Sequence, residues 1–129
     1  MFDWNEALDF ERQSGPYVQY SHARACSILE KADAFERTFV FSDPHEIALA
    51  KQIARFPAVI DRVVRELRPH LLAAYARELA DQFNTFYRYV PVLKSEGETL
   101  QSRLTLVAAA QNTLKEALET LGIDAIRTM

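Results

Sequence analysis

Hydrophobic residues recur along the second half of the chain at helical rather than strand-like spacing. In residues 98–121 the apolar seam advances in alternating steps of four and three, through Leu100, Leu104, Val107, Gln111, Leu114, Leu118 and Leu121. Residues 70–89 carry a comparable stripe, made of Leu72, Tyr75, Leu79, Phe83 and Phe86. Steps of three and four place side chains on one face of an α-helix. The pattern therefore predicts two long amphipathic helices.

Glycine and proline mark the ends of the first and last helices. Gly15-Pro16 separates a short helical segment, predicted over residues 3–13, from a helix predicted over residues 16–34. Gly122 follows the last apolar seam, where a left-handed residue commonly ends a helix.

Two shorter helices are predicted in the middle of the chain. Asp43-Pro44 followed by Glu46 has the composition of a capped helix start, and this helix should run to about Arg55. Pro57 is expected to open the next helix, which ends near residue 67.

Residues 35–42 should form a connection that packs its aromatic side chains, Phe39 and Phe41 among them, inward. The fold class predicted is thus all-α, a bundle of about five helices. Since the connections are short, consecutive helices are expected to pack antiparallel.

Composition supports one folded domain. The chain has 129 residues, is 49% hydrophobic and 26% charged, and is therefore able to bury a core. Its single cysteine, Cys26, fits a reducing compartment and a buried structural role. No apolar run approaches the ~20 residues that span a bilayer. The acidic start lacks the form of a signal peptide. We expect a cytoplasmic protein with no membrane partner.

Charge gives two competing interpretations. The net charge of -3 argues against general nucleic-acid binding. Residues 51–77 nevertheless carry a basic stripe of Lys51, Arg55, Arg62, Arg65, Arg68 and Arg77. Such a stripe is compatible with docking one structured RNA, or it is simply the solvated face of helices.

Catalytic motifs are absent from the sequence. It holds no glycine-rich nucleotide cradle and no nucleophile elbow, and its three histidines lack metal-ligand spacing. The sequence thus predicts neither a metal site nor a catalytic residue.

The most informative surface is predicted on the first long helix. Tyr17, Tyr20 and Arg24 share one face, which differs from the face of Ala25 and Leu29. Aromatic rings stack on unpaired bases, and arginine stacks or binds phosphate, so this stripe suits single-stranded RNA. Alternatively, the tyrosines pack against a neighbouring helix with only their hydroxyls exposed.

Two further stretches of the chain contain candidates for RNA contact. Tyr87 and Arg88 should point away from the apolar face of their helix and be able to reach a partner. Arg127 and Met129, at the end of the sequence, form a second exposed candidate, although terminal residues are often frayed.

Three stretches together resemble arginyl-tRNA synthetases. Phe2-Asp3-Trp4, followed at residues 15–24 by Gly-Pro-Tyr-Val-Gln-Tyr-Ser-His-Ala-Arg, is similar to the passage from the catalytic core to the helical domain of that family. The other two stretches are Leu79-Ala80, Phe83-Asn84, Phe86-Tyr87 and Val92-Leu93, and then Arg103-Leu104 through Leu121-Gly122-Ile123 to a final methionine. The match covers nearly the whole chain.

This resemblance implies a DALR-type helical bundle that receives the anticodon stem-loop of arginine tRNA. The family's base-reading positions correspond here to Tyr17, Tyr20, Arg24 and Met129. Family members commonly end in an acidic residue, an arginine and a methionine. This chain has Arg127, Thr128 and Met129 there, so Arg127 is the candidate to replace that arginine in part.

The resemblance also assigns the chain to a larger enzyme. Residues 1–129 would form a single anticodon-binding domain, in which residues 1–15 lead in from a catalytic domain and residues 16–129 form the bundle. The family's His-x-Gly-His and Lys-Met-Ser-Lys-like strings are missing. This fragment should therefore do no chemistry, whereas the parent would join arginine to tRNA using ATP and Mg²⁺.

Two alternatives stay open. The bundle could be a docking domain that buries Tyr17 and other exposed aromatics against the catalytic domain of the same chain. It could also be the helical domain of a related class I synthetase, for example one for cysteine or methionine.

Overall fold

A computed structural model describes residues 14–129, and these fold entirely into helices and their connections. The helices are α2 (Gly15–Lys31), α3 (Pro44–Ala54), α4 (Phe56–Glu66), α5 (Pro69–Tyr89) and α6 (Gly97–Thr120). The predicted all-α bundle of about five helices is confirmed. The helical segment predicted over residues 3–13 lies outside the described residues. None of the described helices is long and apolar enough to cross a membrane.

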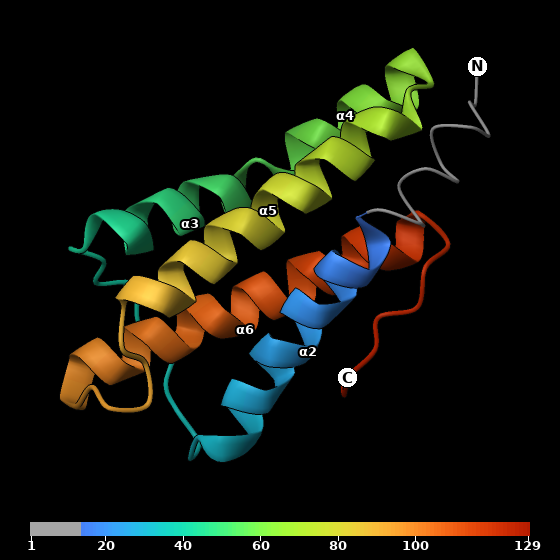
Figure 1. Cartoon of the computed structure of the whole chain (residues 1–129). Helices are drawn as coiled ribbons and strands as arrows, with labels where there is room; N and C mark the ends of the chain where they lie inside the picture. The colour runs from blue at the N-terminus through green and yellow to red at the C-terminus, as the bar shows by residue number, and fades with distance from the viewer. Residues whose placement is uncertain (1–13) are drawn as a thin grey trace.

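The bundle is organised around α5, which packs against each of the other four helices (Figure 1). On one side α2 packs against α5 and α6, and on the other α3 and α4 follow one another along α5. The expected antiparallel packing holds for α5 and α6. It is wrong for α3 and α4, because the single residue Arg55 between them is too short for the two to five residues of a helical hairpin. It is also wrong for α2, whose neighbours are α5 and α6 instead of α3.

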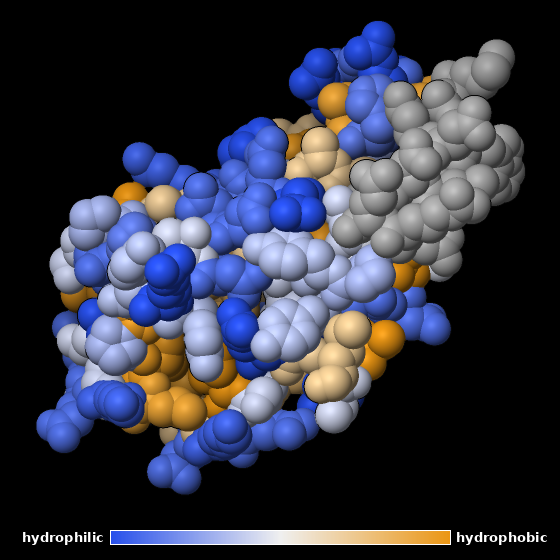
Figure 2. All heavy atoms as spheres, in the orientation of Figure 1, coloured by the Kyte–Doolittle hydropathy of each residue, from blue (hydrophilic) through white to orange (hydrophobic). Residues whose placement is uncertain are grey.

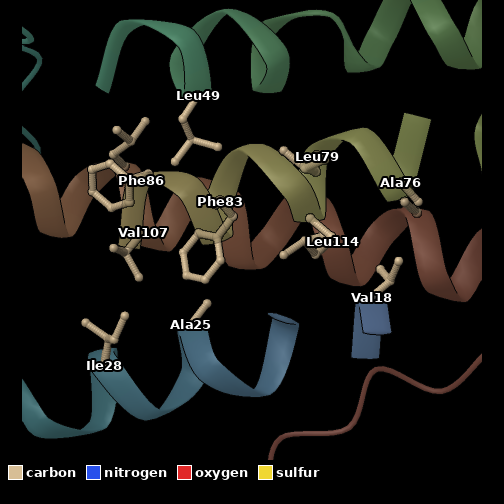
Figure 3. Packing of buried hydrophobic residues seen from close by; sticks show 14 of the residues in the cluster. Val18, Ala25, Ile28, Leu49, Ala76, Leu79, Phe83, Phe86, Val107 and Leu114 are labelled. Atoms are coloured by element: carbon tan, nitrogen blue, oxygen red, sulfur yellow. The ribbon is translucent and has the colours of Figure 1, made fainter. Parts of the chain in front are cut away.

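The core lies where α2, α3, α5 and α6 converge (Figure 3). Phe83 and Phe86 of α5 are completely buried and approach each other with ring centroids 6.4 Å apart. Ala25 of α2 approaches Phe83, whereas Val18 of the same helix lies nearer Ala76 and Leu114, and all four of these smaller residues are completely buried. The apolar stripes predicted for the two long helices are therefore the surfaces that form the core.

The connection between α2 and α3 differs from its prediction at one aromatic residue. Inward positions recur every third residue, at Ala32, Phe35, Thr38 and Phe41, as in an extended threefold backbone. Phe41 packs against the core, but Phe39 is 70% exposed, so the expected inward packing of Phe39 is wrong. The segment lies along α6, whose side chains accept its main-chain N–H groups: Thr38 donates to Thr105 Oγ1 (3.0 Å) and Val40 to Ser102 Oγ (3.1 Å).

The start of α3 has the predicted cap, and the structure gives its glutamate a second role. The Asp43 carboxylate accepts the His45 N–H (2.8 Å), and Glu46 Oε1 accepts the Asp43 N–H (2.8 Å). The other Glu46 oxygen accepts from Arg103 Nε of α6 (3.0 Å). Glu46 is 2% exposed, so this buried carboxylate joins two helices through a charge-assisted hydrogen bond.

The end of α6 is a Schellman turn, as the predicted left-handed Gly122 implied. Gly122 has φ 80°, its N–H donates to the Glu119 carbonyl (3.0 Å), and the Ile123 N–H donates to the Leu118 carbonyl (2.9 Å). Ile123 then packs against the core. The turn reverses the chain, and the residues after it run back along α2 (Figure 1).

A pair of phenylalanines tests where the core lies. Phe83→Ala should lower the free energy of unfolding by about 3–5 kcal/mol, because it removes a completely buried ring and leaves a cavity. Phe39→Ala, a matched change at a largely exposed ring, should alter it by less than about 1 kcal/mol. Urea unfolding followed by circular dichroism measures both. Equal losses for the two variants would contradict the packing described.

Tyr75 gives the core a dependence on pH. It is 2% exposed, and its hydroxyl donates to the Gln52 carbonyl (2.5 Å). Burial raises the pKa of Tyr75 to about 12, because the phenolate would lose its hydration; the Arg55 charge lowers this pKa and Glu78 raises it by smaller amounts.

This pKa shift predicts weaker folding at high pH. The folded-state pKa lies above the value of ~10 for a free tyrosine, so the contribution of neutral Tyr75 is complete below pH ~10. It is lost as the pH rises toward about 12. The stability advantage of the parent over Tyr75→Phe should therefore shrink across this range in urea titrations at stepped pH. A constant difference would show that Tyr75 ionises equally well in the folded chain.

Candidate nucleic-acid interface

Tyr20, Arg24 and Tyr87 form a layered cluster, here called the tyrosine–arginine cluster, between α2 and α5. The Arg24 guanidinium carbon lies 4.8 Å from the ring centroid of Tyr20 and 4.4 Å from that of Tyr87. Arg24 Nη2 also donates to the Tyr20 hydroxyl (3.0 Å). Both rings remain about half exposed, Tyr20 at 46% and Tyr87 at 45%. Two open rings are thus held beside one guanidinium by cation–π contacts.

Asn84 of α5 fixes this arrangement. Its Nδ2 donates to the Tyr17 hydroxyl (3.0 Å) and to Ser21 Oγ (2.8 Å), and its Oδ1 accepts from Arg24 Nη1 (2.9 Å). Both amide hydrogens and one oxygen lone pair are therefore used in contacts with α2. Sequence reasoning gave Asn84 no role, although it is the polar residue directly after Phe83 in the apolar stripe of α5.

Tyr17 makes more contacts with α5 than Tyr20 does. Its hydroxyl donates to Asp81 Oδ1 (2.8 Å), and the Arg77 guanidinium carbon lies 4.1 Å from its ring centroid. Partial burial raises the pKa of Tyr17, an effect that the Asn84 hydrogen bond opposes and Asp81 reinforces. Packing against a neighbouring helix, the alternative weighed for both tyrosines, describes Tyr17 but not Tyr20.

A groove of about 650 Å³ opens beside the cluster. It brings together five of the seven residues predicted to contact RNA: Tyr20, Arg24, Tyr87, Arg127 and Met129. Figure 2 shows hydrophobic atoms in a hollow on this face, bordered by polar side chains. The apolar part of the lining comes from Ile28, Val90, Val92 and Leu93, and its basic groups are Arg24, Lys31, Lys94 and Arg127. Tyr17 and Arg88, the other two predicted residues, are not part of the lining.

The C-terminal tail, residues 123–129, contributes its last three residues to the groove lining. Gln19 Nε2 donates to the Asp124 carbonyl (2.9 Å), and His22 Nδ1 lies 2.9 Å from the Ile126 carbonyl. Arg127 Nη2 reaches Glu30 Oε1 at 3.5 Å between exposed side chains. Three residues of α2, taken in sequence order, thus meet successive parts of the tail. These contacts bring Arg127 and Met129 to the groove, although about a hundred residues separate them from α2 along the chain.

Residues 18–129 match the model of the DALR anticodon binding domain. The chain belongs to the DALR anticodon-binding domain family. Arginine–tRNA ligase of Methanoregula boonei is 72% identical over 129 residues, which cover 100% of this chain and 23% of that protein. Arginine–tRNA ligase of Methanosphaerula palustris is 68% identical over 130 residues, again 100% of this chain and 23% of that protein.

A solved structure shows the same fold. Thermus thermophilus arginyl-tRNA synthetase superposes on 99% of this DALR domain with a TM-score of 0.87 and 39% identity, over 23% of its own chain. The matched proteins are arginine enzymes, as the sequence resemblance implied. This chain spans about a quarter of the length of these relatives.

The basic stripe of the DALR domain lies mostly away from the cluster. Arg77 reaches the ring of Tyr17, but Arg62 and Arg65 lie on α4, which packs on α5 and not on α2. These two arginines pair with carboxylates one turn away, Arg62 with Glu66 (2.7 Å) and Arg65 with Asp61 (2.9 Å). The Arg62 hydrogen bond lowers the pKa of Glu66.

Arg88 is also separate from the groove. Its guanidinium carbon lies 5.3 Å from the ring centroid of Tyr89, which in turn stacks on His45 with centroids 5.1 Å apart. The aromatic segment of α5 therefore divides between two surfaces: Tyr87 faces the groove, while Arg88 and Tyr89 lie near the start of α3.

Removing Asn84 tests whether its amide organises the site. Asn84→Ala should lower the free energy of unfolding by about 1–3 kcal/mol, because Tyr17, Ser21 and Arg24 lose a shared partner. Thr85→Ala is the matched control, since that hydroxyl bonds to the Asp81 carbonyl of its own helix. Chemical unfolding measures both changes. If Asn84→Ala proves as mild as the control, the amide does not organise the interface.

Proposed function

We propose that this chain binds the anticodon stem-loop of arginine tRNA as one domain of a longer arginine–tRNA ligase. The observation that carries the proposal is the groove in which Tyr20, Arg24, Tyr87 and Met129 meet. Family membership and the arginine–tRNA ligases that match the full chain support the same function.

The chemistry of the groove suits unpaired nucleotides. Half-exposed rings offer flat apolar surfaces on which a base removed from its stack is able to lie, a contact worth about 1–3 kcal/mol per base. Arg24 uses one hydrogen on each terminal nitrogen for Asn84 and Tyr20, so further N–H donors remain for a phosphate or base edge. We propose that the main role of the Arg24 guanidinium is to hold the two rings apart. Its positive charge toward the RNA is a secondary contribution.

Local charge favours a polyanion despite the acidic net charge. The lining contains four basic side chains, Arg24, Lys31, Lys94 and Arg127, and one acidic side chain, Glu30. Positive groups that neutralise phosphates release counterions, so binding should weaken as salt increases.

The remaining steps of the reaction belong to the longer enzyme in this proposal. That enzyme would join arginine to tRNA with ATP and Mg²⁺, in a catalytic domain that is the second partner of this chain. The present chain would position the tRNA and perform no chemistry. Among residues 14–129, no three His, Cys, Asp or Glu side chains are placed to hold a metal ion, and we assign ATP and Mg²⁺ to no residue here.

Docking to the catalytic domain is a second candidate function, and α4 is the surface that favours it. The apolar side of α4 packs against the core through Phe56, Val59, Ile60 and Val63, but none of these residues is fully buried. Val64 is 67% exposed, and Leu67, directly after the helix, is 62% exposed. The two functions use different faces, so a single chain is able to serve both.

Binding of a synthetic stem-loop tests the first function. The parent chain should bind an arginine anticodon stem-loop more tightly than one with a non-arginine anticodon, and affinity should fall with salt. Tyr20→Ala and Arg24→Ala should each weaken binding by about tenfold, because a stacking surface or its support is lost. Fluorescence anisotropy measures these affinities.

Tyr89→Ala is the matched control for these variants. Tyr89 is an exposed tyrosine of α5, at 58%, that is not part of the groove lining, so its loss should leave affinity unchanged. Circular dichroism verifies that each variant is folded. If Tyr20→Ala and Arg24→Ala both bind as tightly as the parent, the groove is not the surface that recognises RNA.

A further inference from the structure

The C-terminal tail is anchored both by two apolar side chains and by its main chain. Ile123 and Ala125 turn their side chains toward the core, while the carbonyls of residues 124 and 126 face α2. This alternation is that of an extended chain, in which carbonyls two residues apart point the same way. Gln19 and His22 lie one helical turn apart on α2 and meet these two carbonyls in order.

The surroundings of His22 fix which of its ring nitrogens donates to the tail. It is 1% exposed, and because a carbonyl oxygen only accepts, Nδ1 must carry the hydrogen that is donated to Ile126. In the neutral ring Nε2 is then an acceptor, and Gln111 Nε2 of α6 lies 3.2 Å from it as the donor. Gln111 is the polar member of the otherwise apolar seam of α6, and this hydrogen bond explains why a polar residue stands there.

We propose that Gln19 and His22 are positioning residues for RNA recognition. They fix the tail at residues 124 and 126, so that residues 127–129 line the same groove as the tyrosine–arginine cluster. This inference rests on the proposed RNA-binding function. Neither residue lines the groove, so both act through the tail.

The hydrogen bonds from Gln19 and His22, here called the clamp, end on main-chain atoms of the tail, and this has a consequence for specificity. Because the two hydrogen bonds end on the carbonyl oxygens of residues 124 and 126, they place no requirement on the side chains of residues 127–129. The side chains of Arg127, Thr128 and Met129 are therefore free to be chosen for the nucleotide that they meet.

Variants of Gln19 and His22 test the clamp in the 129-residue chain. Gln19→Met keeps the length of a partly exposed side chain but lacks the donor, and His22→Leu removes the donor at the buried site. His22→Asn is the rescue variant, since an asparagine Nδ2 is able to occupy the place of the imidazole Nδ1. Gln19→Met and His22→Leu should each weaken stem-loop binding about threefold to tenfold, and His22→Asn should weaken it less.

A second measurement follows the tail directly. Trypsin cuts after Arg127, and release of the Thr128-Met129 dipeptide, timed by mass spectrometry, should be severalfold faster in Gln19→Met than in the parent. Gln19→Met keeps this test valid if His22→Leu fails to fold. Equal release rates in the two proteins would overturn the clamp.

A truncation separates the clamp from direct RNA contact. In a chain that lacks residues 127–129, Gln19→Met should have no further effect on affinity, because the residues that it positions are gone. An undiminished effect in that background would mean that Gln19 touches RNA itself, and would overturn the inference. If the parent binds RNA while Gln19→Met and a folded His22→Leu bind equally well, the inference fails and the proposed function stands. If the parent does not bind, both fail.

Discussion

The close approach of α2 to α5 is the constraint on which the site depends. Ser21 and Ala25 lie one turn apart on α2, and both are completely buried, so the two helices meet over small side chains. This proximity lets the short amide of Asn84 reach Tyr17, Ser21 and Arg24 at once. A larger residue at either small position would separate the helices and leave three polar groups without their partner. The geometry of the outer rings is thus set by packing beneath them.

Most helix starts and ends were predictable because they depend on local rules. The end of α2 was not, since the helix stops at Lys31 and not at residue 34. Proline at a helix start, the Asp43–Glu46 cap and the left-handed Gly122 each act over a few residues, and the structure has all three. The arrangement of the helices was only partly predictable. Nothing local indicates that α2 packs on α6, and the direction of Phe39 depends on hydrogen bonds that residues 38 and 40 make to α6.

The candidate site shows the same division. Periodicity alone separated Tyr20 and Arg24 from the apolar face of α2, and both lie on the groove. It did not distinguish Tyr17 from Tyr20, because the difference arises from Asp81 and Arg77 on another helix. Gln111 offered an overlooked signal: a polar residue within an apolar seam needs a buried partner, and His22 is that partner.

The Schellman turn at Gly122 determines where the tail begins its path along α2. Because α2 packs on α6, the start of the tail already lies beside Gln19 and His22. Placing the tail therefore costs the conformational entropy of seven residues, and not that of closing the 105-residue loop between Gln19 and Asp124. Besides the hydrogen bonds from Gln19 and His22, the tail is held by Ile123 and Ala125, which pack against the core. One glycine thus sets the direction in which the chain leaves α6, and with it the place at which Arg127, Thr128 and Met129 border the groove.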